Sequence, residues 1–263
     1  MGFKIFTVDA FTDKPFSGNP AGVCILSEER DEQWMRGVAS EMNLSETAFL
    51  RKNVDGYGLR WFTPKVEVDL CGHATLASAH ILFENGYLKL GEQARFNTRS
   101  GLLTATSKEN WIELDFPKQP VTASSPPTGL VESLGVRPKF VGKNALYYVV
   151  EVDSEEVVRG LKPDYGRLLS VPVNGVAVTS KASTAGFDFV SRFFAPAFGV
   201  NEDPVTGSSH CGLGPFWQER LHKDELTAYQ ASARGGVIRV RVASNRVFLS
   251  GRAVTILQGE LCA

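Results

Sequence analysis

Hydrophobic and polar residues alternate along many short stretches of the chain. Clear examples are FKIFTVDAF at 3–11, WIELDF at 111–116, VIRVRV at 237–242 and RVFLSG at 246–251. Alternation of β-branched and aromatic residues with polar ones is typical of strands that bury one face. The pattern therefore predicts a sheet-rich chain in which strands outnumber helices.

Longer segments without this alternation predict helices at 27–42, 72–85 and 207–222, with a shorter helix near 154–168. The segment 72–85 consists largely of small apolar residues, which let other elements approach a helix closely on all sides. Pro215 lies inside the predicted helix at 207–222. Because proline lacks an N–H and its ring clashes with the preceding turn, we expect it to bend or shorten that helix.

The two halves of the chain repeat each other weakly. LRWFTP at 59–64 has a counterpart in SRFFAP at 191–196, and Cys71-Gly72-His73-Ala74 has one in Thr206-Gly207-Ser208-Ser209. Two later stretches keep the spacing of the second match, namely 100–103 with 235–238 and 111–114 with 246–249. Four matches in one order predict a duplicated domain, with each half a sheet around one small-residue helix.

A proline-rich segment, PKQPVTASSPPTG at 117–129, lies between the two halves. It holds four prolines and little that can pack in a core, as is typical of a linker. We therefore predict an N-terminal domain at 1–118, a linker at 119–128 and a C-terminal domain at 129–263. The last ten or so residues are expected to pack back on the N-terminal domain.

Composition and charge exclude several classes of function. The 28 basic and 29 acidic residues nearly cancel, and they gather in no basic arm that would bind nucleic acid. No apolar run approaches the roughly 18 residues of a membrane span, so we expect no membrane partner. The start of the chain alternates like a strand and lacks the layout of a signal peptide. These features predict a cytoplasmic protein.

The sequence gives no sign of a metal or cofactor. Its four cysteines form no C-x-x-C pair and its four histidines form no H-E-x-x-H motif, so we expect reduced thiols and no metal. No G-x-G-x-x-G or Walker A sequence is present, which argues against a nucleotide or flavin site.

Two predicted helices begin at glycine, one at Gly72 and one at Gly207-Ser208. The first N–H groups of a helix have no partner within it, and the helix dipole adds partial positive charge there. Glycine lets a ligand come close to these groups, so both helix starts are candidate sites for a carboxylate or phosphate. Alternatively, both glycines are only turn residues before buried helices.

Four motifs together resemble the phenazine-biosynthesis PhzF-like family. They are FTDKPFSGNPAG at 11–22, NLSETAF at 43–49, CGHAT at 71–75 and EDPVTGS at 202–208. The resemblance covers almost the whole chain and keeps the family's motif order. It implies an α/β fold with mixed sheets, similar to diaminopimelate epimerase. Such a fold has two pseudo-symmetric domains, each a curved β-sheet wrapped around a central helix, and an active site in the interdomain cleft.

The resemblance assigns a general acid/base to Glu46, in the S-E-T motif, and a substrate-positioning carboxylate to Asp203. His73 is then a hydrogen-bond donor to substrate or a second proton carrier, since histidine titrates near neutrality. The structural alternatives are a solvated or helix-terminal acid for Glu46, a capping or core imidazole for His73, and a helix cap for Asp203.

The remaining substrate-binding candidates are Gly72, Gly207, Ser208 and Cys71. Racemases of this superfamily use two cysteines, one from each half, whereas this chain has Cys71 in one half and Thr206 in the other. Threonine is no comparable acid near neutral pH, so a two-thiol racemase is disfavoured. Cys71 as a buried small hydrophobe and Ser208 as a capping hydroxyl stay open as alternatives.

The residues and the resemblance together predict a cofactor-independent isomerase that transfers a proton on a small carboxylate-bearing substrate. The namesake enzyme isomerises a dihydro-hydroxyanthranilate in phenazine biosynthesis, and the resemblance also implies a homodimer. Three alternatives remain. They are a racemase or epimerase of a small amino or hydroxy acid, a hydrolase with Ser208 or Cys71 as nucleophile, and a non-catalytic small-molecule-binding relative. Arg60 and Arg192, at equivalent places in the repeat, are expected to share a structural role.

Overall fold

The computed structural model describes residues 2–262, which form two compact units. The N-terminal unit comprises the chain up to Phe116 together with the residues from Ser250 onward. The C-terminal unit comprises Pro117–Leu249. The chain thus leaves its first unit after Phe116 and returns to it at the end.

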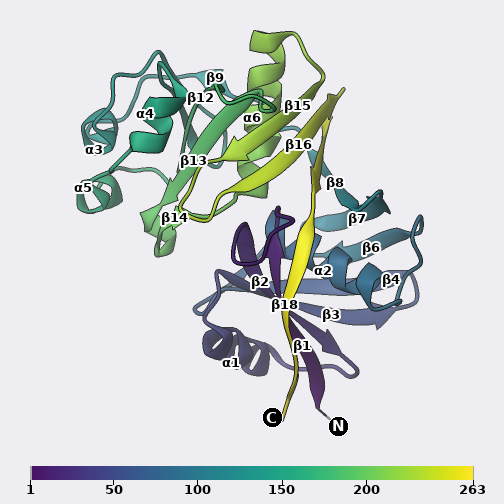
Figure 1. Ribbon diagram of the computed structural model, residues 1–263. Helices are drawn as coiled ribbons and strands as arrows, with labels where there is room; N and C mark the ends of the chain where they lie inside the picture. The colour runs from purple at the N-terminus through teal and green to yellow at the C-terminus, as the bar shows by residue number, and fades with distance from the viewer. Residues whose placement is uncertain (1, 263) are drawn as a thin grey trace. The chain divides into compact units, whose positions relative to one another are not determined.

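The N-terminal unit is a mixed sheet with two helices, α1 (Glu32–Met42) and α2 (Gly72–Glu84). Its strands are β1 (Phe3–Ala10), β2 (Asn19–Leu26), β3 (Glu46–Asn53), β4 (Gly56–Phe62), β5 (Glu67–Val68), β6 (Gln93–Thr98), β7 (Gly101–Lys108), β8 (Trp111–Pro117) and β18 (Ala253–Leu261). The hydrogen-bonded order is β18-β1-β2-β3-β4-β6-β7-β8, with β5 also on β4. In Figure 1 the yellow β18 runs beside the purple β1.

Helix α2 is the core helix of the N-terminal unit. It contacts β1, β2, β3, β7 and β18, and almost all of its residues from Gly72 to Leu82 are buried. Its sequence, GHATLASAHILFE, has no polar face, and its small side chains let strands pack on several sides of it. The small-residue helix expected from the sequence is confirmed.

The C-terminal unit repeats this plan around α6 (Gly207–Leu221), which contacts β15 and β16. Its strands are β9 (Thr122–Ala123), β10 (Phe140–Lys143), β11 (Tyr148–Glu151), β12 (Val176–Lys181), β13 (Phe189–Ala195), β14 (Val200–Asp203), β15 (Glu225–Gln230), β16 (Gly236–Ala243) and β17 (Arg246–Gly251). Its short helices are α3 (Leu130–Leu134), α4 (Glu155–Gly160), α5 (Tyr165–Leu169) and a 3-10 turn at Pro196–Phe198.

The strand pairings of the two units match one for one. β1–β2 and β10–β11 are antiparallel, and β2–β3 and β11–β12 are parallel. β3–β4 and β12–β13 are antiparallel, and β4–β6 and β13–β15 are parallel. Even the outer pairings correspond, since β18 bonds to β1 as β9 bonds to β10. The duplication predicted from sequence is present in the topology.

The expected shortening of the helix at Pro215 is wrong, because α6 continues through this residue to Leu221. A proline at this position leaves the carbonyl of Cys211 without its helical donor. The backbone N–H of Gln119 donates to that carbonyl at 3.0 Å. The proline-rich segment therefore supplies the hydrogen bond that the helix lacks.

Two other helix predictions need correction at their ends. The first helix begins at Glu32 rather than at residue 27, because Asp31 accepts a hydrogen bond from the backbone N–H of Trp34 and caps it. The segment near 154–168 forms two short helices, α4 and α5, capped by Ser154 and Asp164.

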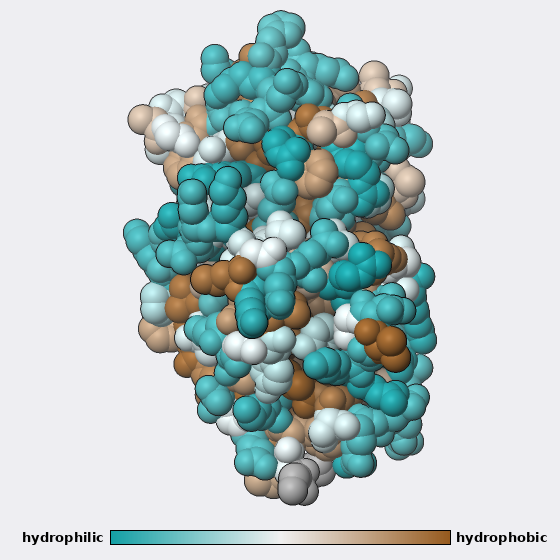
Figure 2. Space-filling view, turned by 90° about the vertical axis from the view of Figure 1, so that its right-hand side faces the viewer, coloured by the Kyte–Doolittle hydropathy of each residue, from teal (hydrophilic) through white to brown (hydrophobic). Residues whose placement is uncertain are grey.

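Several large hydrophobic side chains are exposed among the described residues. The most exposed are Val54, Leu90 and Phe16. On the face that Figure 2 draws, hydrophobic residues lie in small groups among hydrophilic ones. Among residues 2–262, no helix has both the length and the apolar composition needed to cross a membrane.

Candidate active site

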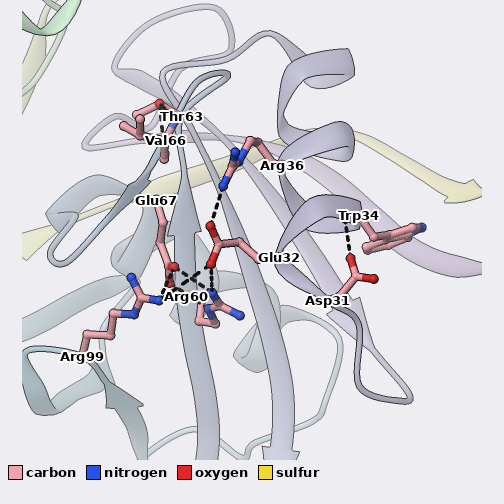
Figure 3. Close-up of polar contacts among 9 residues, drawn as sticks. All are labelled: Asp31, Glu32, Trp34, Arg36, Arg60, Thr63, Val66, Glu67 and Arg99. Carbon is pink, nitrogen blue, oxygen red and sulfur yellow. Dashed lines mark hydrogen bonds and ion pairs between the residues drawn. The ribbon is translucent and has the colours of Figure 1, made fainter.

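The start of α2 is held in place by an ion-pair network around the buried carboxylate of Glu67. Nε and Nη2 of Arg60 each lie 2.7 Å from a carboxylate oxygen of Glu67. Nη2 of Arg99 also lies 2.7 Å from one of these oxygens. Figure 3 shows the two arginines converging on Glu67, with Glu32 beside them. Since Arg60 is on β4 and Glu67 on β5, the pair fixes the strand that leads into α2.

The C-terminal unit repeats this ion pair at the equivalent strands. Arg192 on β13 lies 2.7 and 2.8 Å from the two carboxylate oxygens of Glu202 on β14. It also donates to the carbonyl of Leu161 at 2.8 Å. Arg60 and Arg192 therefore share a structural role, as the sequence predicts, and each anchors the approach to a helix start.

Three of the predicted site residues meet in the N-terminal unit. A carboxylate oxygen of Glu46, the first residue of β3, lies 3.2 Å from Nε2 of His73 in the first turn of α2. On the other side of the imidazole, Sγ of Cys71 lies 3.5 Å from Nδ1. Cys71 and His73 are buried, while the Glu46 side chain keeps 19% of its surface exposed. The arrangement places one accessible carboxylate against an enclosed imidazole and thiol.

Burial determines the charge of the His73 imidazole. Loss of hydration lowers the pKa of His73 from 6.5 to about 3, so its ring is neutral near pH 7. A neutral ring donates from one nitrogen and accepts at the other. With the proton on Nε2, His73 donates to the Glu46 carboxylate and Nδ1 accepts from the Cys71 thiol. With the proton on Nδ1, Nε2 instead accepts a hydrogen bond from the protonated carboxyl group of Glu46. The imidazole can therefore serve either protonation state of Glu46.

The other helix start carries a different polar network. Asp203, at the end of β14, accepts a 2.5 Å hydrogen bond from the hydroxyl of Thr206. The side chain of Gln230 accepts from the Thr206 backbone N–H at 2.8 Å and donates to the Asp203 carbonyl at 2.8 Å. Gly207 is buried and Ser208 is half-buried at the first two positions of α6. Neither Thr206 nor Cys71 caps its helix with a side-chain hydrogen bond.

Sequence reasoning missed Gln230 altogether. It is fully buried at the end of β15 and holds the backbone on both sides of the helix start. No motif surrounds it in the sequence, since its role arises only when β15 pairs beside β13.

The repeat shows which groups have no counterpart in the other unit. Cys71 and His73 correspond to Thr206 and Ser208. Glu46 corresponds to Gly175 by strand pairing. Arg60 pairs with Phe49, and the equivalent Arg192 pairs with Val178. Glu46 lies three residues before Phe49, and Gly175 lies three residues before Val178. A side chain at Gly175 would come within 2.5 Å of the Phe193 ring. Glu46, Cys71 and His73 therefore have no chemical counterpart at the equivalent places of the other half.

Potential metal ligands also gather at this place. Within residues 2–262, one group of three such side chains has all its ligand atoms within 4.8 Å of one another, and it consists of Glu46, Cys71 and His73.

Comparison with known proteins agrees with this architecture. The family described as "Phenazine biosynthesis-like protein" matches residues 8–259. The chain is 55% identical over 262 residues to a protein of Halalkalibacterium halodurans named an uncharacterized isomerase, and the match covers 99% of both chains.

Solved structures show the same relationship. A crystal structure of a PhzF-family phenazine biosynthesis protein from Enterococcus faecalis matches with a TM-score of 0.94 and 40% identity over 100% of both chains. A probable proline racemase from Agrobacterium radiobacter matches at 0.66 with 11% identity, covering 99% of this chain and 93% of that one, which shows a shared fold alone. The mixed α/β fold of the epimerase and racemase type, predicted from sequence, is confirmed. The chain belongs to the PhzF-like family of phenazine biosynthesis-like proteins.

Proposed function

We propose that the protein is an isomerase that transfers a proton on a small carboxylate-bearing substrate, with Glu46 as the acid/base and no cofactor. The observation that carries the proposal is the contact of the partly exposed Glu46 carboxylate with the neutral imidazole of His73 at 3.2 Å. The isomerase name of the Halalkalibacterium relative supports the reaction class.

The first step of the proposed reaction takes a proton from a substrate carbon. His73, protonated at Nε2, donates to the Glu46 carboxylate and holds it in the ionised form that can accept the proton. The electron pair of the broken C–H bond delocalises into the substrate. The N–H groups at the start of α2 lie at the positive end of the helix dipole, which favours the charge that develops.

In the second step Glu46 returns the proton to another carbon of the same delocalised system. The net result is a shift of one hydrogen and of the double bonds, without any change in oxidation state. General acid/base catalysis of this kind contributes about 10²–10⁴-fold to a rate. We assign Asp203, Gly207 and Ser208 to positioning the substrate.

The lack of acid/base groups at the equivalent places of the repeat supports one base over two. A racemase of the two-thiol type needs a proton carrier from each half, and Thr206 and Gly175 supply neither thiol nor carboxylate. We therefore favour an isomerase over a racemase or epimerase for this chain.

The Cys71–His73 pair also gives some support to a second candidate, a hydrolase with a thiol nucleophile. Its Sγ–Nδ1 distance of 3.5 Å is within reach for activation of a thiol. This candidate predicts a covalent adduct on Cys71 and complete loss of turnover in Cys71→Ser. The isomerase predicts that Cys71→Ser keeps measurable turnover, because the thiol does not carry the transferred proton.

The test is isomerisation of dihydro-3-hydroxyanthranilate in heavy water, followed by NMR. We expect solvent deuterium to enter at carbon with the wild type, and a rate lower by about 10²–10⁴-fold with Glu46→Gln. Glu84→Gln, an exposed glutamate at the end of α2, is the matched control and should leave the rate unchanged. Circular dichroism checks that each variant is folded.

Two outcomes would contradict the proposal in different ways. Turnover that survives in Glu46→Gln would remove Glu46 as the base. Absence of exchange with the wild type would reject this substrate and shift the search to other small unsaturated carboxylates.

A further inference from the structure

We propose that Glu46, Cys71 and His73 form a binding site for one soft divalent metal ion of the zinc type, and that its binding inhibits the protein. The metal site stands on geometry alone, whereas the inhibition rests on the proposed function of Glu46.

The distances among the three side chains are close to those of a tetrahedral zinc site. Bond lengths of about 2.1 Å to nitrogen and oxygen and about 2.3 Å to sulfur place N and O about 3.4 Å apart and N and S about 3.6 Å apart. The corresponding distances here are 3.2 Å from Nε2 of His73 to the Glu46 carboxylate and 4.0 Å from Nε2 to Sγ of Cys71. All ligand atoms of the group lie within 4.8 Å of one another. Adjustments of about 1 Å at the side-chain ends would therefore complete three of four positions.

The backbone holds the three ligands on regular secondary structure. Cys71 immediately precedes α2, His73 lies in its first turn, and Glu46 begins β3, which packs against α2. A site built on such elements costs little reorganisation when the ion binds. Because the Glu46 side chain is partly exposed, it offers the ion a route from solvent.

The chemistry of the ligands selects the metal. A thiolate, an imidazole and a carboxylate suit Zn²⁺ and Co²⁺, whereas Mg²⁺ and Ca²⁺ prefer oxygen alone. On binding, the Cys71 thiol releases its proton to solvent and the sulfur bonds to the ion. The two anionic ligands then balance the charge of the metal. The fourth position stays open to water, as in zinc sites with three protein ligands.

Metal binding would stop proton transfer because the ion and the reaction need the same atoms. A metal-bound Glu46 oxygen is a weaker base, and a metal-bound Nε2 of His73 no longer donates to the carboxylate. The equivalent residues of the C-terminal unit, Gly175, Thr206 and Ser208, supply no thiol, imidazole or carboxylate. We therefore expect one tight ion per chain.

The experiment titrates the reduced, metal-free protein with CoCl₂ and records the sulfur-to-cobalt charge-transfer absorption in the near ultraviolet. We expect saturation at one Co²⁺ per chain and displacement by ZnSO₄ but not by MgCl₂. Cys71→Ser should abolish the absorption, and His73→Asn should weaken metal binding by on the order of 100-fold or more. Cys262→Ser removes an exposed thiol outside the cluster and serves as the matched control, which should bind as the wild type does.

Two results would overturn the metal site. One is the absence of charge-transfer absorption in the wild type. The other is an absorption that is lost in Cys262→Ser and retained in Cys71→Ser.

Zinc should also slow deuterium exchange in the isomerase assay, with the same midpoint as in the binding titration. Full activity at saturating zinc would overturn the inhibition while leaving the site intact. Failure of the activity assay itself would concern the proposed function alone, because the absorption needs no substrate.

Discussion

The starts of α2 and α6 occupy the same place in two copies of one fold, yet they carry different chemistry. Both follow a short strand fixed by a bidentate Arg–Glu pair, and both place glycine at the first helical position. In the N-terminal unit the surrounding side chains are a carboxylate, an imidazole and a thiol. In the C-terminal unit they are a hydroxyl and a carboxylate bonded to each other, and an amide bonded to the backbone.

The comparison distinguishes residues that fix the backbone from residues that are able to carry protons. Duplication retained the groups that fix the backbone, namely the ion pair, the glycine and the strand pairings. Two titratable side chains of the N-terminal copy have no counterpart at the equivalent places, since Glu46 is matched by Gly175 and His73 by Ser208. The proposed function therefore assigns acid/base chemistry to one copy and the positioning of the substrate to the other.

Removing the arginine of each Arg–Glu pair should give the largest difference in free energy of unfolding between the two copies. Arg192→Met leaves the Glu202 carboxylate largely buried without its cation, and should lower the free energy of unfolding by about 3–5 kcal/mol. Arg60→Met should cost about 1 kcal/mol, because Arg99 remains 2.7 Å from Glu67 and Arg60 is more exposed. Urea denaturation measures both. Adding Glu202→Gln to Arg192→Met should recover part of the loss, and equal losses in the two single variants would contradict the predicted difference.

A smaller difference in the free energy of unfolding is expected for Gln230 and Thr98, the polar residues at the ends of two equivalent strands. Gln230 and Thr98 are equivalent, since they pair with the equivalent residues Gly236 and Gly101. Gln230→Ala leaves the Thr206 N–H and the Asp203 carbonyl without these bonds, and should cost about 2–3 kcal/mol.

Thr98→Ala is the matched control and should cost less than about 1 kcal/mol, because its hydroxyl bonds to the carbonyl of Gly101 at an exposed turn. Thermal unfolding compares the two variants. A loss in Gln230→Ala no larger than that in Thr98→Ala would show that the amide contributes nothing to the helix start.

The two core helices also carry one buried histidine each, and both are expected to reduce stability in acid. Burial lowers the pKa of His73 to about 3 and that of His210 to about 4, from 6.5. Below about pH 6.5 the unfolded chain binds protons at these sites and the folded chain does not, so stability falls as the pH decreases toward 4 and 3. Each histidine should remove about 2 kcal/mol by about pH 5.

Unfolding at about pH 7.5 and about pH 5 measures this loss. His73→Asn and His210→Asn should each reduce the difference in stability between the two pH values. His222→Asn, at the end of α6, should leave it unchanged. A pH difference that stays the same in both buried variants would show that these two histidines do not cause the loss.

Much of the architecture could be predicted from the sequence because the duplication left matching residues at fixed spacing. The two core helices, the strands that carry Arg60 and Arg192, and the shared structural role of these arginines all followed from it. Strands β2 and β18 did not. The sequence of β2, NPAGVCIL, contains proline and glycine and no alternation, and it forms a strand because it lies between β1 and β3.

Pro215 shows why a local rule failed. The rule concerns an isolated helix, whereas in this fold the N–H of Gln119, distant in the chain, replaces the missing hydrogen-bond donor. No local pattern contains that contact.

The sequence by itself determined which residues are chemically able to act, because a motif fixes residue types and their order. Glu46, Cys71 and His73 were all candidates on this ground. Only the tertiary structure decided that they meet, because the contact depends on the packing of β3 against α2. It also decided that the imidazole is neutral, since burial, which no sequence motif specifies, sets its hydration and hence its charge.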